Sequence, residues 1–459
     1  MKRNALKILK LWLNKSNRKP LVLRGARQVG KSTLVNLFAR ENNKDIIEIN
    51  LELYRELDSV FASLQVDRIL LSIQSVSEKK ITKNTILFLD EIQAAPNGIA
   101  ALRYFYEKKP DLPIIAAGSL LEFTLSKHQF SMPVGRIEYL YLDPMTFTEF
   151  LEEIDPVNAE ILADFDIGKP LPNIIHNKLL CRQREYMLIG GMPEAVKIYS
   201  ETGTLSEVVS VQNSICNTYM DDFSKYAQEK ELLSLQQIFR KVPQVMSNKL
   251  KYTNLLADEK SAVTKKLLDL LIKAQIIRPA VISNVSGIPL AAGKNEKFRK
   301  LYFLDIGLVS RLLQFDNIDL ERLNERELIN EGPLAEQFIS QHLNLDKTLQ
   351  TGPELFYWAN EGKNKNAEID FVVSKGRLIV PIEIKAGQSG SLKSLHYFMY
   401  QKKLEYAIRF DMNEHSEFNV STKISLGDKL VDSNYSLLSL PLYCVEKVDD
   451  ILDYIRRSL

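Results

Sequence analysis

The stretch LVLRGARQVGKSTLVNLF, residues 21–38, decides the fold of the N-terminal part of this chain. An apolar run leads into Gly25-x-x-x-x-Gly30-Lys31-Ser32, after which apolar residues recur at helical spacing. In this order of strand, loop and helix, the two glycines let backbone N–H groups face a phosphate at the helix N-terminus. The stretch therefore predicts a Walker A loop on a parallel P-loop sheet.

The residues of this loop have distinct expected roles. Lys31 would reach the β- and γ-phosphates, and Ser32 would bind a magnesium ion. The predicted nucleotide-binding residues of the loop are Gly25, Gly30, Lys31, Ser32 and Thr33. The predicted cofactors are ATP and Mg²⁺, and the alternative is an ordinary glycine turn before a helix.

A second motif, TILFLDEIQAAPN, predicts a buried strand at residues 86–89 that ends in two acids. Asp90 at the strand tip would hold the magnesium shell, and Glu91 would orient the attacking water. The alternative is a pair of acids that only cap the strand end. An acid pair beside a P-loop favours hydrolysis over nucleotide binding alone.

Two more residues are candidates for sensing or stabilising the γ-phosphate. LPIIAAGSLLEF predicts a third strand, and ligands of open parallel sheets bind at the strand C-terminal ends, where Ser119 lies. Ser119 could instead cap a helix. Arg136 could stabilise the transition state, in the same chain or from a neighbouring subunit, or could form a surface ion pair.

The set RGARQVGKST, LFLDEIQ, AAGSLLEF, GR…YLDPMTFTEFL and IGGMPEAV resembles a widespread bacterial and archaeal family of AAA-type ATPases. The resemblance covers essentially the whole chain. It implies ATP hydrolysis, a helical lid after the core that closes over nucleotide, and a C-terminal domain of unknown function. Because relatives of this type often form rings, a homo-oligomer is also open.

The pattern along the chain predicts a multidomain α/β protein. We expect a P-loop ATPase core at 1–144, a helical lid at 145–229, a winged-helix-like module at 230–315 and a C-terminal domain at 325–459. The winged-helix-like module is predicted from three helical segments followed by two β-like runs around a loop, which is the winged-helix order.

Charge is segregated along the chain. Residues 240–300 carry thirteen Lys and Arg against four Asp and Glu, a local balance of +9, so the remainder carries −7 of the total of +2. Such a segment favours an acidic partner, here DNA or RNA. The basic side chains expected on the third helix and in the hairpin are Lys265, Lys266, Lys273, Lys294, Lys297, Arg299 and Lys300. The alternative is a module that packs between domains and whose lysines are only solvated.

The C-terminal order of helix, three strands, helix and strand (αβββαβ) resembles the core of the PD-(D/E)XK nuclease superfamily, a restriction-endonuclease-like fold. Asp370 ends the second predicted strand, and Glu383 and Lys385 share one face of the third. Asp370 and Glu383 could bind a divalent cation, and Lys385 could stabilise the attacking water or the phosphorane. Glu336, on the preceding helix, matches the auxiliary acid of the superfamily.

These residues leave two functional hypotheses. The first is an ATP-hydrolysing machine that transmits its nucleotide state to a metal-dependent nuclease domain. The second is an ATP-dependent switch or binding protein whose nuclease-like domain is inactive.

Composition narrows the setting. The three cysteines are far apart and form no CxxC pair, which argues against a zinc site or a disulfide framework. No apolar run reaches the length of about 18 residues that a membrane span needs. Lysines interrupt the apolar residues at the N-terminus and no cleavage site follows, which argues against a signal peptide. We therefore expect a cytoplasmic protein with no membrane contact.

Overall fold

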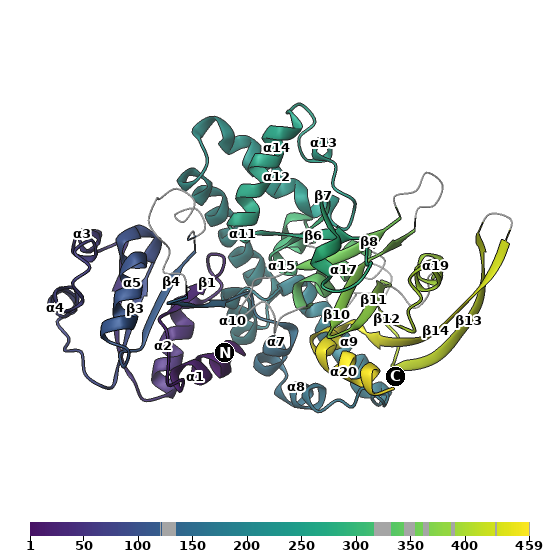
Figure 1. Ribbon diagram of the computed structural model, residues 1–459, viewed down its shortest axis with the longest axis horizontal. Coiled ribbons are helices and arrows are strands. Elements are labelled where there is room, and N and C mark those ends of the chain that lie inside the picture. Colours follow the sequence, from purple (N-terminus) through teal and green to yellow (C-terminus); the bar gives the residue numbers. More distant parts are fainter. Residues whose placement is uncertain are drawn as a thin grey trace.

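The computed structural model describes most of the chain (Figure 1). The residues it describes are 1–119, 121, 135–315, 332–343, 354–360, 367–386, 391–426 and 429–458. The predicted start of the C-terminal domain, residue 325, lies outside them. Three lobes are visible: the N-terminal lobe on the left, a helical lobe above the centre, and the C-terminal lobe on the right.

The N-terminal lobe contains a five-stranded sheet in the order β2-β3-β4-β1-β5. All neighbouring strands in it are parallel. Its strands are β1 (Leu21–Arg24), β2 (Asp45–Asn50), β3 (Thr85–Asp90), β4 (Ile114–Gly118) and β5 (Glu138–Tyr141). A parallel sheet whose first strand runs into the glycine-rich loop confirms the predicted P-loop architecture.

Helices cover both faces of this sheet, because side chains alternate along each strand. Leu23 and Phe88 belong to the core shared with the first two helices, whereas Val22 and Leu87 face the other three. The helices are α1 (Ala5–Leu13), α2 (Lys31–Glu41), α3 (Leu57–Phe61), α4 (Val66–Ser77) and α5 (Pro96–Lys108). The N-terminal segment in which lysines interrupt the apolar residues folds as α1.

A run of helices follows β5, as the sequence predicts. They are α7 (Phe147–Ile154), α8 (Pro156–Ala163), α9 (Asn173–Ile189), α10 (Pro193–Thr202) and α11 (Leu205–Asp222). Thr146 and Glu149 form a reciprocal capping box at the start of α7. No helix within the described ranges combines the length and the apolar composition that crossing a bilayer requires.

The upper lobe has three helices followed by a hairpin, in the predicted order. They are α12 (Glu229–Val245), α13 (Tyr252–Leu255), α14 (Ser261–Lys273), β6 (Ile277–Ser283) and β7 (Lys294–Phe303), after which α15 (Ile306–Leu312) follows. The sheet extends beyond the β6–β7 hairpin, because β6 also pairs in parallel with a strand from the C-terminal lobe. The helical lobe and the C-terminal lobe therefore share one sheet, β7-β6-β8-β9.

The C-terminal lobe contains the expected helices and strands with two differences. The described elements are α17 (Gly332–His342), β8 (Leu355–Ala359), β9 (Glu368–Ile369), β10 (Phe371–Lys375), β11 (Leu378–Ile384), α19 (Lys393–Lys402) and β12 (Tyr406–Asp411). The second predicted strand is divided at Asp370 into β9 and β10, which lie in different sheets. The first predicted strand, β8, pairs with β6 and β9 rather than with the second sheet.

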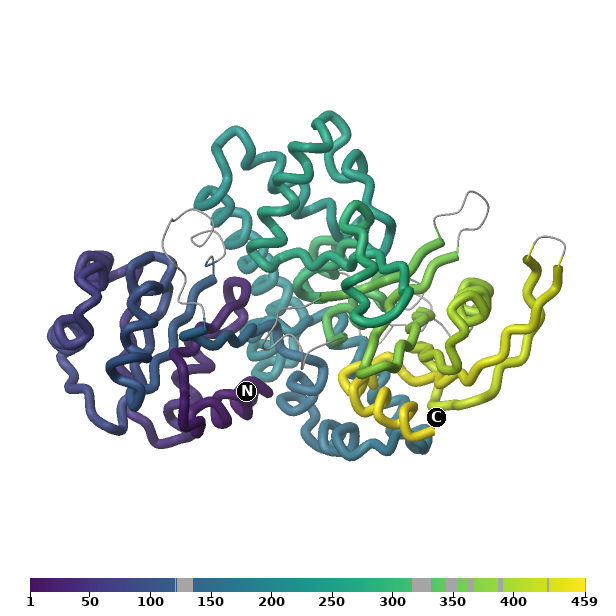
Figure 2. The backbone as a smooth tube through the Cα atoms, in the orientation of Figure 1, coloured from purple at the N-terminus to yellow at the C-terminus, as the bar shows by residue number. Residues whose placement is uncertain are grey.

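The second sheet has the order β10-β11-β12-β14-β13. Its long hairpin, β13 (Ser416–Leu426) and β14 (Lys429–Pro441), and the terminal helix α20 (Val448–Ser458) were not predicted. The tube in Figure 2 shows this hairpin extending at the far right.

One apolar core runs from the first face of the P-loop sheet through the helices into the C-terminal lobe. Phe147 of α7 packs against Phe338 of α17, with ring centroids 5.9 Å apart. Phe239 of α12 packs against Phe303 of β7 at 5.3 Å. The lobes are thus joined by buried packing, which can transmit a displacement at one lobe to the next.

Candidate functional site

The P-loop backbone is shaped by its glycines. Gly25 has φ +154° and Gly30 has φ +89°, so both lie in the region that favours glycine. A Cβ on Gly25 would lie 2.3 Å from the backbone oxygen of Leu142. Any side chain at this position would therefore displace the loop from the segment after β5.

The Lys31 side chain lies over the loop from which it emerges. Its Nζ donates to the carbonyl oxygens of Gly25 at 3.1 Å and Ala26 at 2.8 Å. Burial lowers the pKa of Lys31 to about 8, and the carboxylates of Glu91 and Asp90 oppose this shift. The side chain is therefore mostly charged at neutral pH and can meet a phosphate.

Ser32 and Asp90, the two predicted magnesium ligands of the P-loop domain, contact each other. The Ser32 hydroxyl donates to Oδ2 of Asp90 at 2.6 Å. Burial raises the pKa of Asp90, and the Ser32 hydrogen bond acts against that rise. Two hard oxygen donors side by side suit Mg²⁺, which is usually held by a few protein oxygens together with phosphates and water.

A cavity of about 570 Å³ opens at the P-loop between α2 and α10. It is lined by Gly30, Thr33 and Leu37 from the loop and α2, and by Pro193 and Lys197 from α10. The volume lies within the range of small-molecule and cofactor sites. Thr33, predicted from sequence, is exposed to this cavity.

Glu91, Gln93 and Ser119 meet at the C-terminal ends of β3 and β4. Glu91 has φ +52°, a strained conformation for a residue other than glycine, and such strain is concentrated at functional sites. Its carboxylate accepts a hydrogen bond from the Gln93 amide. A Cβ on Gly118 would lie 2.4 Å from Oε1 of Gln93, which places this amide against the end of β4.

Ser119 is buried there, and its hydroxyl has no hydrogen-bond partner among the described residues. An unpaired buried hydroxyl at a strand end is consistent with contact to a ligand. Sequence reasoning missed Gln93, although this residue lies within the acidic motif.

The structure does not bring Arg136 to this site. The residue precedes β5, and the parallel pairing of β5 with β1 puts it at the edge of the sheet opposite the P-loop. Its guanidinium forms an ion pair with Glu107 at 3.4 Å and lies 5.9 Å from the ring centroid of Tyr106. Within one chain, Arg136 therefore has the surface role that the sequence left as its alternative.

Two basic residues that sequence reasoning missed hold the P-loop to its surroundings. Arg3 donates to the Val29 carbonyl oxygen at 3.0 Å and pairs with Glu149 at 3.1 Å. Arg27 pairs with Asp222 at the end of α11, and the Tyr219 hydroxyl donates to the Arg27 carbonyl oxygen at 2.7 Å. Both contacts join residues remote in sequence, so no local pattern indicates them.

The IGGMPEAV motif connects the P-loop domain to the C-terminal half. The Gly191 N–H donates to Oδ2 of Asp305 at 2.6 Å, and the Gly191 carbonyl oxygen accepts from Met145 at the same distance. Gln341 of α17 donates to Asp305 at 3.2 Å. Next along the chain, Pro193 lies against Gly30, 3.4 Å from the position of a Cβ on that glycine.

In the C-terminal lobe, the four predicted residues lie in one neighbourhood. The Lys385 ammonium donates to Oε1 of Glu383 at 2.6 Å, and Oδ2 of Asp370 accepts from the Ile384 N–H at 2.8 Å. Glu336 accepts from the Tyr302 hydroxyl at 2.8 Å. Burial raises the pKa of both Glu336 and Glu383, and the charge of Asp370 adds to each rise.

A cation from outside the predicted set lies among these acids. Lys300 of β7 is 1% exposed, and its ammonium lies 3.4 Å from Oε2 of Glu336 and 3.8 Å from Oδ1 of Asp370. It also forms an ion pair with Glu368. The carboxylates hold the pKa of Lys300 above its ordinary value although burial opposes them. This outcome differs from the expected exposed phosphate contact, because the Lys300 side chain points into the C-terminal lobe.

The geometry does not match a ready metal site. Within the part of the chain that the structure describes, no group of three or more His, Cys, Asp or Glu side chains is placed to hold a metal ion. The Lys300 ammonium lies where a cation shared by Glu336 and Asp370 would lie. The predicted Asp370–Glu383 metal pair stays a prediction.

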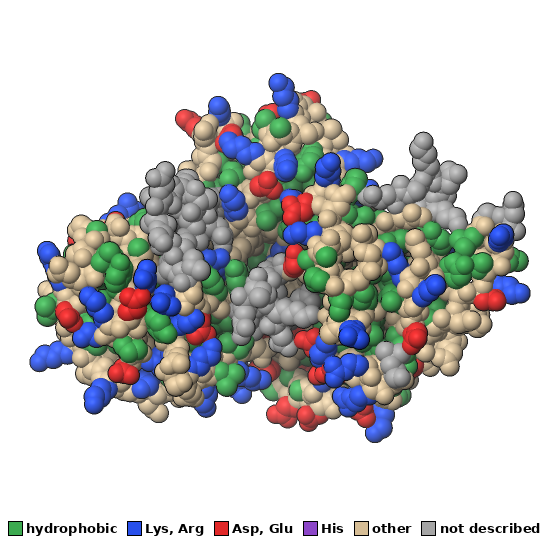
Figure 3. Space-filling model, viewed as in Figure 1, with side chains coloured by type: hydrophobic (Ala, Val, Ile, Leu, Met, Phe, Trp, Pro, Cys, Tyr) green, Lys and Arg blue, Asp and Glu red, His purple; other side chains and the backbone are tan. Residues whose placement is uncertain are grey.

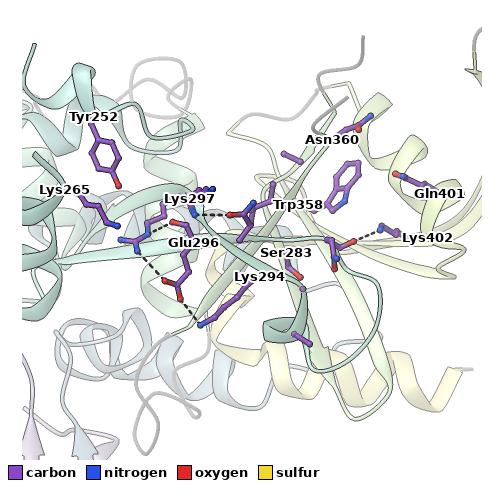
Figure 4. A pocket seen from close by; sticks show the side chains of 17 residues that line it. Tyr252, Lys265, Ser283, Lys294, Glu296, Lys297, Trp358, Asn360, Gln401 and Lys402 are labelled. Atoms are coloured by element: carbon purple, nitrogen blue, oxygen red, sulfur yellow. Dashed lines mark hydrogen bonds and ion pairs between the residues drawn. The ribbon is translucent and has the colours of Figure 1, made fainter. Parts of the chain in front are cut away.

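A basic groove lies between the upper lobe and the C-terminal lobe. Its volume is about 970 Å³, and it is lined by α13, α14, the β6–β7 hairpin, β8 and the end of α19. Figure 4 shows Tyr252 and Lys265 on one side, Trp358 and Lys402 on the other, and Lys297 between them. On the visible face in Figure 3, Lys and Arg side chains are spread over all three lobes, and on the upper lobe acidic side chains lie among them.

Comparisons with known sequence families cover three segments. Residues 17–151 match an AAA domain, which makes the N-terminal segment a P-loop domain of AAA type. Residues 182–319 match the domain of unknown function DUF8612, and residues 331–426 match the domain of unknown function DUF4143. No curated protein matches the chain significantly.

Solved structures show a distant likeness. The Aeropyrum pernix ORC1 protein in complex with DNA is 12% identical, over 68% of this chain and 90% of that chain, with a TM-score of 0.27. The Thermotoga maritima RuvB Holliday junction branch migration motor is 18% identical, over 61% and 89%, with a TM-score of 0.25. AMPPCP-bound DnaA from Aquifex aeolicus is 13% identical, over 60% and 88%, with a TM-score of 0.26. TM-scores this low do not establish a shared fold over the aligned length.

Proposed function

We propose that this protein is an ATP-hydrolysing switch that binds nucleic acid in the groove between its upper and C-terminal lobes. The proposal of ATP hydrolysis rests on one observation. Lys31, the Ser32–Asp90 pair and Glu91 lie close together just after the ends of β1 and β3. A phosphate-binding lysine, two hard oxygen donors and a free acid are the groups that phosphoryl transfer to water requires.

Each residue has a defined task in this proposal. The ammonium of Lys31 and the N–H groups of the loop bind the β- and γ-phosphates. Ser32 and Asp90 hold Mg²⁺, which neutralises charge on the phosphates when it is bound. Glu91 orients the attacking water, and Gln93 fixes the carboxylate of Glu91 against the end of β4.

ATP turnover tests this half directly. We expect Lys31→Ala to abolish ATP binding, and Glu91→Gln to retain binding while hydrolysis falls about 10²-fold or more. Lys83→Ala, which removes an exposed lysine of the same lobe, is the matched control. Hydrolysis that persists in Lys31→Ala would show that the site lies elsewhere.

The second half rests on the charge and shape of the groove. Its lining includes the basic residues Lys265, Lys294, Lys297, Arg299 and Lys402, against Glu296 as the acid. A concave surface with this excess of positive charge attracts a phosphate backbone and releases its counterions. Tyr252 and Asn360 supply further polar contacts at the groove wall.

Salt-dependent binding of DNA and RNA oligonucleotides tests this surface. In the double variant Lys265→Ala/Lys297→Ala, we expect the slope of log affinity against log salt to fall by about two, since each lost phosphate contact removes about one counterion. Lys423→Ala, an exposed lysine on β13 away from the groove, should leave the slope unchanged. An unchanged slope in the double variant would remove the groove as the binding surface.

Packed contacts provide a route between the two sites. Pro193 lies against Gly30 of the P-loop, and two residues before it Gly191 bonds to Asp305, just beyond β7. Since β7 lines the groove, a movement of α10 on nucleotide binding would reach the groove through buried contacts. We therefore expect ATP to change nucleic-acid affinity.

The specific observation that favours a second candidate, a metal-dependent nuclease, is the convergence of Asp370, Glu383 and Lys385. Incubation of the protein with plasmid, linear DNA and RNA, with Mg²⁺ or Mn²⁺, tests it. Cleavage that is lost in Asp370→Asn would support the nuclease, whereas ATP turnover without cleavage would support the switch.

A further inference from the structure

We propose that the ammonium of Lys300 is the resident cation of a carboxylate cluster made of Glu336, Glu368 and Asp370, in the place that a divalent metal ion shared by these acids would take. The inference goes beyond ATP hydrolysis and nucleic-acid binding, and either of these can fail without affecting it. It assigns β7 the role of joining the upper lobe to the C-terminal lobe by a buried ionic contact.

The position of the ammonium carries the inference. It lies within ion-pair distance of Glu336 on α17, Glu368 on β9 and Asp370 at the break between β9 and β10. Three carboxylates from two separate segments of the chain therefore converge on one nitrogen. Hard metal ions bind oxygens at about 2.0–2.6 Å, so a metal bound by the same acids would need the space that the ammonium fills.

Burial makes the ammonium hard to displace. The Lys300 side chain is 1% exposed, and its Nζ also lies 5.5 Å from the ring centroid of Tyr357. A buried ammonium is stable only while its counter-charges are present, and removal of one partner leaves the other uncompensated. The acids of the cluster thus depend on Lys300, and Lys300 depends on them.

The neighbouring residue explains how one strand serves both regions. Because side chains alternate along β7, Lys300 points into the cluster while Arg299 lines the groove and pairs with Asp269 at 3.2 Å. The opposite side of the cluster retains acceptor capacity, because Oε2 of Glu383 is buried without a hydrogen-bond partner among the described residues. Removal of the ammonium would leave a set of acids with room for another cation.

Manganese binding to the full-length, nucleotide-free protein tests the proposal. Electron paramagnetic resonance measures the free Mn²⁺ during the titration. The Mn²⁺ bound at the cluster is the amount that is lost when Asp370→Asn is introduced, so Mn²⁺ bound at the P-loop is not counted. We expect wild-type protein and Asp370→Asn to bind equal amounts. Lys300→Met, which keeps much of the apolar stem, should gain one equivalent that disappears in Lys300→Met/Asp370→Asn.

Two controls match this design. Lys300→Arg retains the charge and should gain no Mn²⁺, and Lys423→Met removes an exposed lysine of β13 and should behave as wild type. Thermal unfolding with and without Mn²⁺ reports the fold, and the metal should raise the melting temperature of Lys300→Met only.

Two results would overturn the proposal. The first is one equivalent of Mn²⁺ that the wild-type protein binds and that Asp370→Asn loses. The second is a Lys300→Met variant that folds but binds no additional Mn²⁺. If Lys300→Met does not fold, the wild-type, Lys300→Arg and Asp370→Asn titrations still decide the question. Equal binding in all three supports the resident ammonium, and an Asp370-dependent equivalent in wild type contradicts it.

Discussion

At the scale of single residues, identical side chains have different roles because their surroundings differ. Lys31 and Lys300 are both buried, yet burial lowers the pKa of Lys31 whereas carboxylates raise that of Lys300. Lys31 bonds to loop carbonyls that a phosphate can replace, while Lys300 faces three acids of its own chain. The first ammonium is therefore available for a ligand, and the second is already paired.

The pKa of Lys31 predicts how nucleotide binding depends on pH. In the nucleotide-free protein its pKa is lowered to about 8, and bound phosphate would raise it again. Above that pH the free protein loses the proton that binding requires, so ATP affinity should fall by up to about tenfold per pH unit between about pH 8 and about pH 10. Lys31→Arg keeps its charge at these pH values, and its affinity should stay level.

Calorimetric titration of ATP across this range measures the effect. A wild-type affinity that does not change with pH would show that the Lys31 ammonium is not the phosphate ligand.

The position of Arg136 predicts that it is dispensable within one chain. Because its ion pair with Glu107 lies at the opposite edge of the sheet, Arg136→Ala should retain ATP hydrolysis within about twofold. Steady-state phosphate release at several protein concentrations is the measurement. A loss of activity together with a concentration-dependent rate in wild type would instead place Arg136 in the site of a neighbouring copy.

At the scale of elements, the glycine pair before α10 explains why the IGGMPEAV motif contains no side chains at its bend. A Cβ on Gly191 would lie 1.9 Å from the Met145 carbonyl oxygen, and one on Gly190 would lie 2.1 Å from Oδ1 of Asp305. The segment must therefore pass close to the Met145 backbone and to the Asp305 side chain before the helix begins. The sequence predicted a bend here, but only the structure shows what the bend packs against.

This close approach predicts a large difference between two glycine substitutions. Gly191→Ala should lower the free energy of unfolding by about 1–3 kcal/mol, because the added methyl group overpacks the contact with Met145. Gly287→Ala, whose Cβ meets nothing within 4 Å, should change it by less than about 0.5 kcal/mol. Urea unfolding followed by circular dichroism compares them, and equal stabilities would contradict the packing described for the bend.

Among the elements, local patterns predicted β1, β3 and β4 of the P-loop sheet, because each is a largely apolar run followed by a predicted functional residue, whereas β2 and β5 were not predicted. They predicted the strands of the C-terminal lobe but not their pairing. Pairing of β6 with β8 joins segments between which β7, α15 and α17 lie, and no periodicity in either segment specifies its partner. The division at Asp370 follows from this, since β9 joins one sheet and β10 the other.

At the scale of the whole molecule, buried contacts join the P-loop to the helices that follow its domain. Arg27 of the loop pairs with Asp222 at the end of α11, and Tyr219 bonds to the backbone of Arg27. A change in the loop on nucleotide binding would therefore also move the end of α11. This contact is separate from the route through Gly191 and Asp305.

The Arg27–Asp222 ion pair predicts a variant that uncouples the lobes. Asp222→Ala should hydrolyse ATP at a rate within a fewfold of wild type but lose part of the ATP-dependent change in nucleic-acid affinity, which for allosteric sites is typically 5–150-fold. Asp221→Ala, which removes the exposed neighbouring acid, is the matched control. Fluorescence anisotropy of a labelled oligonucleotide with and without ATP measures the change. A full ATP effect in Asp222→Ala would show that this ion pair does not couple the sites.

The sequence was sufficient to predict the P-loop and the acids beside it, because the loop residues are consecutive and the acids follow directly on a buried strand. It also predicted Asp370, Glu383 and Lys385 at one edge of a sheet from strand ends and period-two spacing, whereas Glu336 came only from the resemblance to the nuclease superfamily. Only the tertiary structure decided that Arg136 faces away from the P-loop and that Lys300 enters the carboxylate cluster. Burial and ion pairing depend on which remote segments pack together, and the charge of a lysine in a sequence does not reveal which of its possible partners it meets.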